Sequence, residues 1–150
     1  MRHKKKQVSI AMNSALLDEI GKSEEPQDWI TLDKVLKDQY FVEAFATSNA
    51  FAGFDYHFPV VLRFEEYDLS INIDQERMSL RAILHKGDAL DQLCHDSTSH
   101  EEECIYWHRV SELEDCCGEK MICVDRPCGP GDTVHFELED HEFALQLIEK

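Results

Sequence analysis

Apolar residues recur at every second position in two series between residue 60 and residue 73, and this period of two constrains the fold more than any other feature of the chain. One apolar series runs from Val60 to Phe64, and a second runs from Tyr67 to Ile73. Successive side chains of a strand point to opposite faces of a sheet, so each series predicts a strand with one apolar and one more polar face. Such strands suit an antiparallel sheet, and we expect an antiparallel meander here.

Strand patterns also occur outside this central region. The stretches are residues 7–13, 78–84, 104–110, 121–124, 134–138 and 143–147. The last two predict a terminal hairpin with a turn at residues 139–141. Residues 78–84 fit the third strand of the meander, although residues 75–84 also tolerate a helical pattern.

The N-terminal third carries helical patterns. Asn13 or Ser14 can cap a helix that ends near Gly21. A stripe of apolar residues at helical spacing then predicts a longer helix over Thr31–Thr47. Two helices should therefore precede the meander and pack their apolar sides against it.

A further short helix is expected after the meander in the sequence. Ser111 and Glu114 form a capping-box pattern, and Gly118 ends the helix. The elements together predict a single α+β domain over residues 1–150, in which N-terminal helices pack on a mainly antiparallel β-sheet of about five to seven strands. Residues 1–6 should form a flexible basic tail.

The folded body should be strongly acidic. The chain has 31 acids and 15 bases, for a formal net charge of −16. Four bases, Arg2, Lys4, Lys5 and Lys6, sit within the first six residues, which leaves 11 bases against 31 acids, or −20, in the other 144 residues. A surface of this charge repels nucleic-acid phosphates and anionic lipids and speeds the encounter with basic partners. Acidity also confers solubility by itself, and that simpler explanation stays open.

Acidic residues gather in two segments of the C-terminal third. If one face displays both segments, they can occupy the basic groove of a nuclease or another nucleic-acid-handling enzyme. DNA-mimic antirestriction proteins and immunity proteins act on this physical basis, so we expect a small inhibitor of this class with a basic protein partner. The acids expected to bind the partner are Glu101, Glu102, Glu103, Glu112, Glu114, Asp115 and Glu119 in the first segment and Glu137, Glu139, Asp140 and Glu142 in the second.

A DNA-binding alternative rests on residues 4–47. The basic residues at positions 4–6 lead into the strand pattern of residues 7–13, and two predicted helices follow. This order resembles the opening of ribbon-helix-helix DNA-binding proteins. The resemblance implies a dimeric regulator whose strand contacts DNA, whereas the acidic body opposes direct binding to nucleic acid.

All six cysteines fall between Cys94 and Cys128. Their chemistry depends on the compartment. The apolar run Val8–Leu17 contains polar residues and lacks a small-residue cleavage site, so a secretory signal is not expected. No window approaches the ~18–20 apolar residues that cross a bilayer. We therefore expect a soluble cytoplasmic protein with no membrane partner, in which thiols stay reduced.

Zinc is the cofactor that a reduced cysteine cluster indicates. Zinc takes four thiolate or imidazole ligands in a tetrahedron, commonly from closely spaced pairs, and this chain has no C-x-x-C pair. If zinc binds, the predicted ligands are Cys104, Cys116 or Cys117, Cys123 and Cys128, because the last three flank one short strand. Free buried thiols and disulfides are the alternatives.

A thiol-dependent or metal-dependent enzyme is the third class of function that the composition permits. A thiol hydrolase needs a cysteine, a histidine that takes the thiol proton and a polar residue that orients the histidine. The candidates are Cys104, Cys116 and Cys128 with His108, His135 and His141. No P-loop, G-x-G-x-x-G, nucleophile-elbow or H-E-x-x-H pattern occurs, so no residue is assigned a catalytic role.

Overall fold

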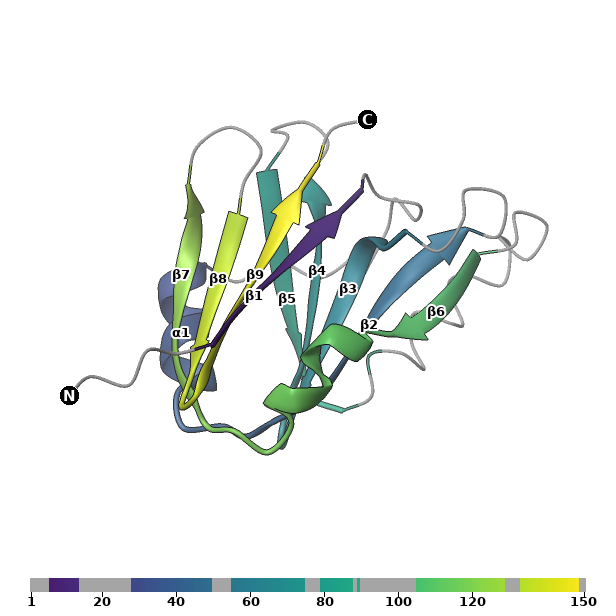
Figure 1. Cartoon of the computed structure of the whole chain (residues 1–150). Coiled ribbons are helices and arrows are strands. Elements are labelled where there is room, and N and C mark those ends of the chain that lie inside the picture. The colour runs from purple at the N-terminus through teal and green to yellow at the C-terminus, as the bar shows by residue number, and fades with distance from the viewer. Residues whose placement is uncertain are drawn as a thin grey trace.

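The computed structural model describes residues 6–13, 28–49, 55–74, 79–87, 89, 105–128 and 133–148. Within these residues the chain is mostly β-structure (Figure 1). The strands are β1 (Lys6–Met12), β2 (Phe41–Asn49), β3 (His57–Phe64), β4 (Asp68–Asp74), β5 (Ser79–His85), β6 (Ile105–Arg109), β7 (Met121–Cys128), β8 (Thr133–Leu138) and β9 (His141–Leu147). The helical elements are α1 (Trp29–Leu36) and a 3-10 helix, η2 (Ser111–Cys116).

The strands form two sheets that face each other as a sandwich (Figure 1). The first sheet has four strands in the order β1-β9-β8-β7, in which β1 runs parallel to β9 and the other neighbours are antiparallel. The second sheet has five antiparallel strands in the order β5-β4-β3-β2-β6. The predicted meander is confirmed as β3, β4 and β5, and the predicted terminal hairpin is confirmed as β8 and β9.

Four aromatic rings join the two sheets. Phe136 and Phe143 project from the first sheet, and their rings stack with centroids 4.9 Å apart. Phe143 also lies 5.6 Å from Phe41 of the second sheet, and Phe41 meets Phe64 edge-on at 5.7 Å. All four side chains are buried. Burial of apolar surface on this scale is the main stabilising contribution to a domain, and aromatic contacts add to it.

The α-helix α1 packs beside β7. The Asp28 carboxylate caps its first turn by accepting hydrogen bonds from the Thr31 amide (2.8 Å) and hydroxyl (2.7 Å). The helix ends at Leu36, and Asp38 then adopts a left-handed φ of 70°, which turns the chain toward β2. The helix is therefore defined by a cap at one end and a sharp turn at the other.

The helix predicted over Thr31–Thr47 is wrong beyond Leu36. Residues 41–49 form β2 instead, which lies inside the five-stranded sheet between β3 and β6. Val42, Phe45 and Thr47 favour strands, and hydrogen bonding on both edges of β2 outweighs an apolar spacing that either structure can satisfy.

The predicted α+β class is wrong as well. The described residues form a sandwich of nine strands, and no pair of N-terminal helices packs on one sheet within them. The helix predicted to end near Gly21 lies outside the described residues, as do residues 1–5 of the predicted tail, whereas Lys6 belongs to β1. Because β1 pairs with β9 of the same chain and the expected second helix is mostly β2, the described residues lend no support to the ribbon-helix-helix resemblance.

One end of the sandwich, at the bottom of Figure 1, is built from connections that lie close together. The Gly118 amide donates to the Phe41 carbonyl (2.8 Å), and the Phe41 amide donates to the Glu119 carbonyl (2.9 Å). These bonds join the start of β2 to the connection between η2 and β7. The turn between β8 and β9 lies at the same end, because the Asp140 amide bonds to the Glu119 carboxylate (2.7 Å).

None of the helices within the described ranges has the length and the apolar character needed to cross a membrane.

Candidate metal centre

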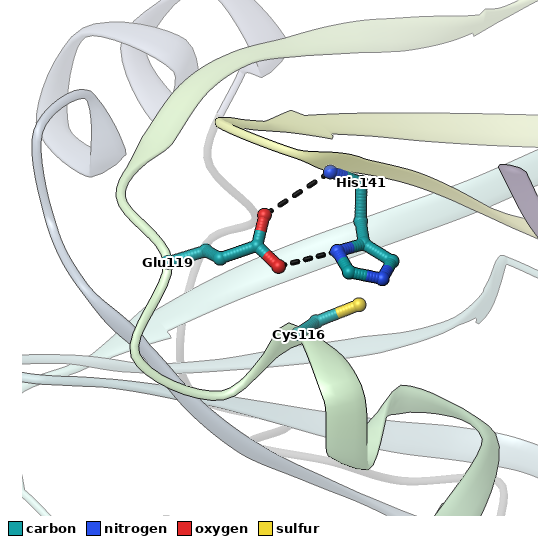
Figure 2. Close-up of side chains that lie close together, drawn as sticks. All are labelled: Cys116, Glu119 and His141. Atoms are coloured by element: carbon teal, nitrogen blue, oxygen red, sulfur yellow. Dashed lines mark hydrogen bonds and ion pairs between the residues drawn. The ribbon is translucent and has the colours of Figure 1, made fainter. Parts of the chain in front are cut away.

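Three possible metal ligands meet at this end of the sandwich. Cys116 is the last residue of η2, Glu119 lies in the connection from η2 to β7, and His141 is the first residue of β9. One donor atom from each side chain lies within 4.8 Å of the other two (Figure 2). These residues could hold a metal ion.

The local backbone places Cys116 and Glu119 on this spot. After η2 the Glu119 amide donates to the Cys116 carbonyl (3.2 Å), and Gly118 adopts a φ of 86°, which favours glycine. This tight turn brings the two side chains to the same side of the connection, as Figure 2 shows. The predicted short helix is therefore confirmed as a 3-10 helix with a glycine near its end, but the predicted capping box is wrong, because Val110 is the N-cap residue and no side chain caps the helix.

Glu119 ties the two segments together. One carboxylate oxygen accepts hydrogen bonds from the amides of Asp140 (2.7 Å) and His141 (3.1 Å). The other carboxylate oxygen accepts a hydrogen bond from Nδ1 of His141. In return, the Glu139 carboxylate accepts a hydrogen bond from the Lys120 amide (2.8 Å). Each segment thus supplies a carboxylate that satisfies backbone donors of the other, which fixes their relative position.

The Cys116 thiol sits in an environment that keeps its proton. The side chain is 0% exposed. Burial, together with the nearby negative charges of Glu119 and Asp115, raises the pKa of the thiol from 9.0 to about 12. The neighbouring Cys117 is exposed. At neutral pH Cys116 is therefore a buried neutral thiol.

Cys116 should react much more slowly with an alkylating agent in the folded protein than in the unfolded chain. Raising the thiol pKa from 9.0 to about 12 lowers the thiolate fraction at pH 8 by about a thousandfold, and burial slows the reaction further. Mass spectrometry of iodoacetamide-treated Cys117→Ser protein, with and without urea, measures this at Cys116. Cys117 in the unmutated protein is the exposed control. Equal rates of Cys116 modification in buffer and in urea would contradict the environment described here.

The same environment separates two chemical uses of the group. A nucleophilic cysteine must be accessible and readily deprotonated, and Cys116 is neither. The carboxylates that disfavour a thiolate instead favour a cation, which would offset the negative charges of Glu119 and of the deprotonated sulfur. The arrangement of Cys116, Glu119 and His141 suits metal binding better than thiol hydrolysis.

Of the metal ligands predicted from the sequence, only Cys116 belongs to this group. Cys116 belongs to the ligand group, whereas Cys123 in β7 directs its sulfur toward a Glu137 carboxylate oxygen, 3.9 Å away. Cys128 ends β7, a strand of eight residues, or about 23 Å, that begins beside this site. Cys104 lies outside the described residues. Cys116 therefore meets Glu119 and His141, which the cysteine pattern did not single out as ligands.

The acids expected to bind a partner are partly brought together. Glu112, Glu114 and Asp115 are exposed on η2, and Glu139 and Asp140 are exposed in the β8–β9 turn at the same end. Glu137 and Glu142 are half-buried on β8 and β9, and residues 101–103 lie outside the described residues. Glu119 is the exception, since its carboxylate serves the β8–β9 turn.

A second polar group lies on the outer face of the five-stranded sheet, and the sequence patterns did not reveal it. Ser70 Oγ lies 2.8 Å from Nε2 of His85, and the Ser70 hydroxyl also lies 3.4 Å from the Ile83 carbonyl oxygen. Ser70 and His85 are 2% and 7% exposed. A serine nucleophile must reach its substrate, so this pair is a buried polar contact of the sheet and not a hydrolase site.

The fold and these groups define a β-sandwich protein that carries a candidate metal centre and a set of exposed acids at one end. No protein-family model matches the chain, and searches of curated proteins and of solved structures return no match.

Proposed function

We propose that the protein is an acidic binding protein that inhibits a nucleic-acid-handling enzyme by occupying its basic surface. One observation carries the proposal: two acidic segments that are separate in sequence converge at one end of the sandwich. η2 supplies Glu112, Glu114 and Asp115, and the β8–β9 turn supplies Glu139 and Asp140. A net charge of −16 for the whole chain adds a long-range attraction for a basic partner.

The acids are held in place before any partner arrives. The hydrogen bonds of the Glu119 and Glu139 carboxylates fix the β8–β9 turn against the connection that follows η2. Glu65 and Glu66 lie at the same end, because the Glu65 amide donates to the Tyr40 carbonyl (3.0 Å) and Tyr40 pairs with Lys120, the neighbour of Glu119. A preorganised negative surface reduces the ordering that binding requires and speeds the encounter with a positive one.

The proposal predicts that charge reversal at this end weakens binding more than the same reversal elsewhere. A basic protein captured from source lysate would be tested against Asp115→Lys/Asp140→Lys. The control is Asp55→Lys/Asp125→Lys, which changes the net charge equally but lies before β3 and within β7. We expect the association rate to fall about tenfold or more in the first variant and less than about threefold in the control.

The measurement is the association rate at several salt concentrations, with circular dichroism to verify folding. Capture of a basic protein does not by itself support the proposal; the difference in association rate between the two variants does. Equal losses in the two variants would assign the attraction to net charge alone, and binding that ignores salt would contradict an electrostatic interface.

Zinc binding is a second candidate function, favoured by the donor set of Cys116, Glu119 and His141. A thiolate, an imidazole and a carboxylate are all ligands that zinc takes in proteins, whereas magnesium and calcium prefer sites built from oxygen alone. We propose this group, in place of the cysteine set that the sequence indicates, as the zinc site of the chain.

A further inference from the structure

We infer that a zinc ion at Cys116, Glu119 and His141 is structural and links η2 to the β8–β9 hairpin, so that metal occupancy controls the order of the acidic end. This inference rests on the proposed zinc site. It goes beyond metal binding, because it gives the ion the role of joining two parts of the fold.

The three donors come from separate parts of the chain. Cys116 ends η2, and His141 begins β9, 25 positions later. In the structure, the hydrogen bonds of the Glu119 carboxylate join these regions. An ion bound to Cys116 and His141 would add a direct connection between η2 and β9, and metal–ligand bonds strongly stabilise the folded state relative to the unfolded chain.

The distances suit a zinc ion after a small adjustment. Zinc lies about 2.3 Å from sulfur and about 2.0–2.2 Å from nitrogen or oxygen, so tetrahedral ligands are roughly 3.4–3.8 Å apart. The donors of the group already lie within 4.8 Å of one another. Nδ1 of His141 and a Glu119 carboxylate oxygen are already in hydrogen-bond contact. Zinc binding would therefore need side-chain rotation that brings the more distant donors closer by up to about 1 Å and separates any two ligand atoms that are now in direct contact.

The charges also suit a divalent cation. Zinc would replace the Cys116 thiol proton, which passes to water, while His141 stays neutral and keeps its N–H on the ring nitrogen that does not hold the metal. The ion, the thiolate and the Glu119 carboxylate then sum to zero. The Cys116 sulfur is buried, and the His141 and Glu119 side chains are only 12% and 13% exposed. Burying a cluster with no net charge costs less free energy than burying a charged one.

Three protein ligands leave one position of the zinc tetrahedron. His141 and Glu119 retain partial exposure, so water can take that position from the solvent side. The fully buried Cys116 forms the inner wall of the site. The ion would therefore lie near the surface at this end of the sandwich, between the two segments that carry the exposed acids.

The experiment uses four proteins, all prepared free of metal: the wild type, the ligand variants Cys116→Ser and His141→Gln, and the control Cys117→Ser. Circular dichroism tests that each one folds. Zinc(II) is titrated against a chromophoric chelator, and thermal unfolding and amide exchange at Asp140 and His141 are followed with and without zinc. His141 is partly exposed, so its variant reports on the site even if Cys116→Ser fails to fold.

We expect one zinc per chain at this site in the wild type and in Cys117→Ser, and a loss of affinity of more than about 100-fold in both ligand variants. With free zinc at 100 times Kd, Tm should rise by roughly 5–10 °C and exchange at Asp140 and His141 should slow.

The other outcomes separate the two proposals. Zinc binding that depends on Cys116 and His141 but leaves Tm and exchange unchanged would overturn the structural link and leave the zinc site standing. Binding that is absent, or that is equal in the wild type and the ligand variants, would overturn both. The charge-reversal test uses none of these ligand variants, so a failure of the acidic-surface proposal is seen in that test and not in this one.

Discussion

Replacing Phe143 by alanine should lower the free energy of unfolding by about 4 kcal/mol, because large-to-small changes of a buried phenylalanine cost about 3–5 kcal/mol. Phe143 is 0% exposed and touches the core from both sides, with Phe136 at 4.9 Å and Phe41 at 5.6 Å between ring centroids. Phe136 belongs to the same sheet and Phe41 to the opposite one. The cavity would therefore open at the contact between the sheets.

Phe45→Ala is the matched control. Phe45 is also a strand phenylalanine, but it is half-buried and lies under the Arg63 guanidinium, 5.5 Å from its ring centroid. We expect its loss to cost about 1–2 kcal/mol. Urea unfolding followed by circular dichroism measures both variants. If the two losses were equal, Phe143 would not be at the centre of the interface between the sheets.

The strands could be predicted from sequence because their signal is local. In β4 and β8 apolar residues alternate with polar ones along the sequence, and this period can be read without knowing the partner strand. The helix error has the same origin: Phe41 and Phe45 satisfy a helical spacing, and the pairing of β2 with β3 and β6, which decides against a helix, involves distant residues.

The division into two sheets could not be predicted from local patterns. Lys6 pairs with His141, so the parallel contact of β1 and β9 joins the two ends of the described chain. Nothing in a single sequence marks such a pair. A local reading leaves the strands in one sheet and gives the helical segments the task of covering it, which produced the incorrect α+β class.

The candidate metal centre was partly within reach of sequence reasoning. Cys116 and His141 are both candidates for thiol chemistry in the sequence, but six cysteines and eight histidines allow many pairings. Glu119 was one acid among 31 acidic residues. What selects it is the turn at Gly118 and two amide donors of the β8–β9 turn, and both depend on the folded chain.

Replacing Asp68 by alanine should lower the free energy of unfolding by about 3 kcal/mol, because removing one partner of a buried charge pair costs about 3–5 kcal/mol and Arg63 stays partly solvated. The Asp68 carboxylate accepts hydrogen bonds from Arg63 at 3.1 and 3.2 Å and from the buried Ala89 amide at 2.8 Å. The alanine variant would leave that amide without its acceptor and the guanidinium without its closest anion.

Arg63 offers a control on the same guanidinium. Glu43 also contacts it, but at 3.5 Å and with 26% of its side chain exposed, against 4% for Asp68. We expect Glu43→Ala to cost less than about 1 kcal/mol, as exposed ion pairs do. Urea unfolding of Asp68→Ala, Glu43→Ala and Arg63→Ala, with the double variants, measures each coupling. Equal couplings would mean that the burial of Asp68 does not strengthen its pair with Arg63, whereas a larger Asp68 coupling would show that it does. The Ala89 bond cancels in this cycle and contributes only to the loss of the single Asp68→Ala variant.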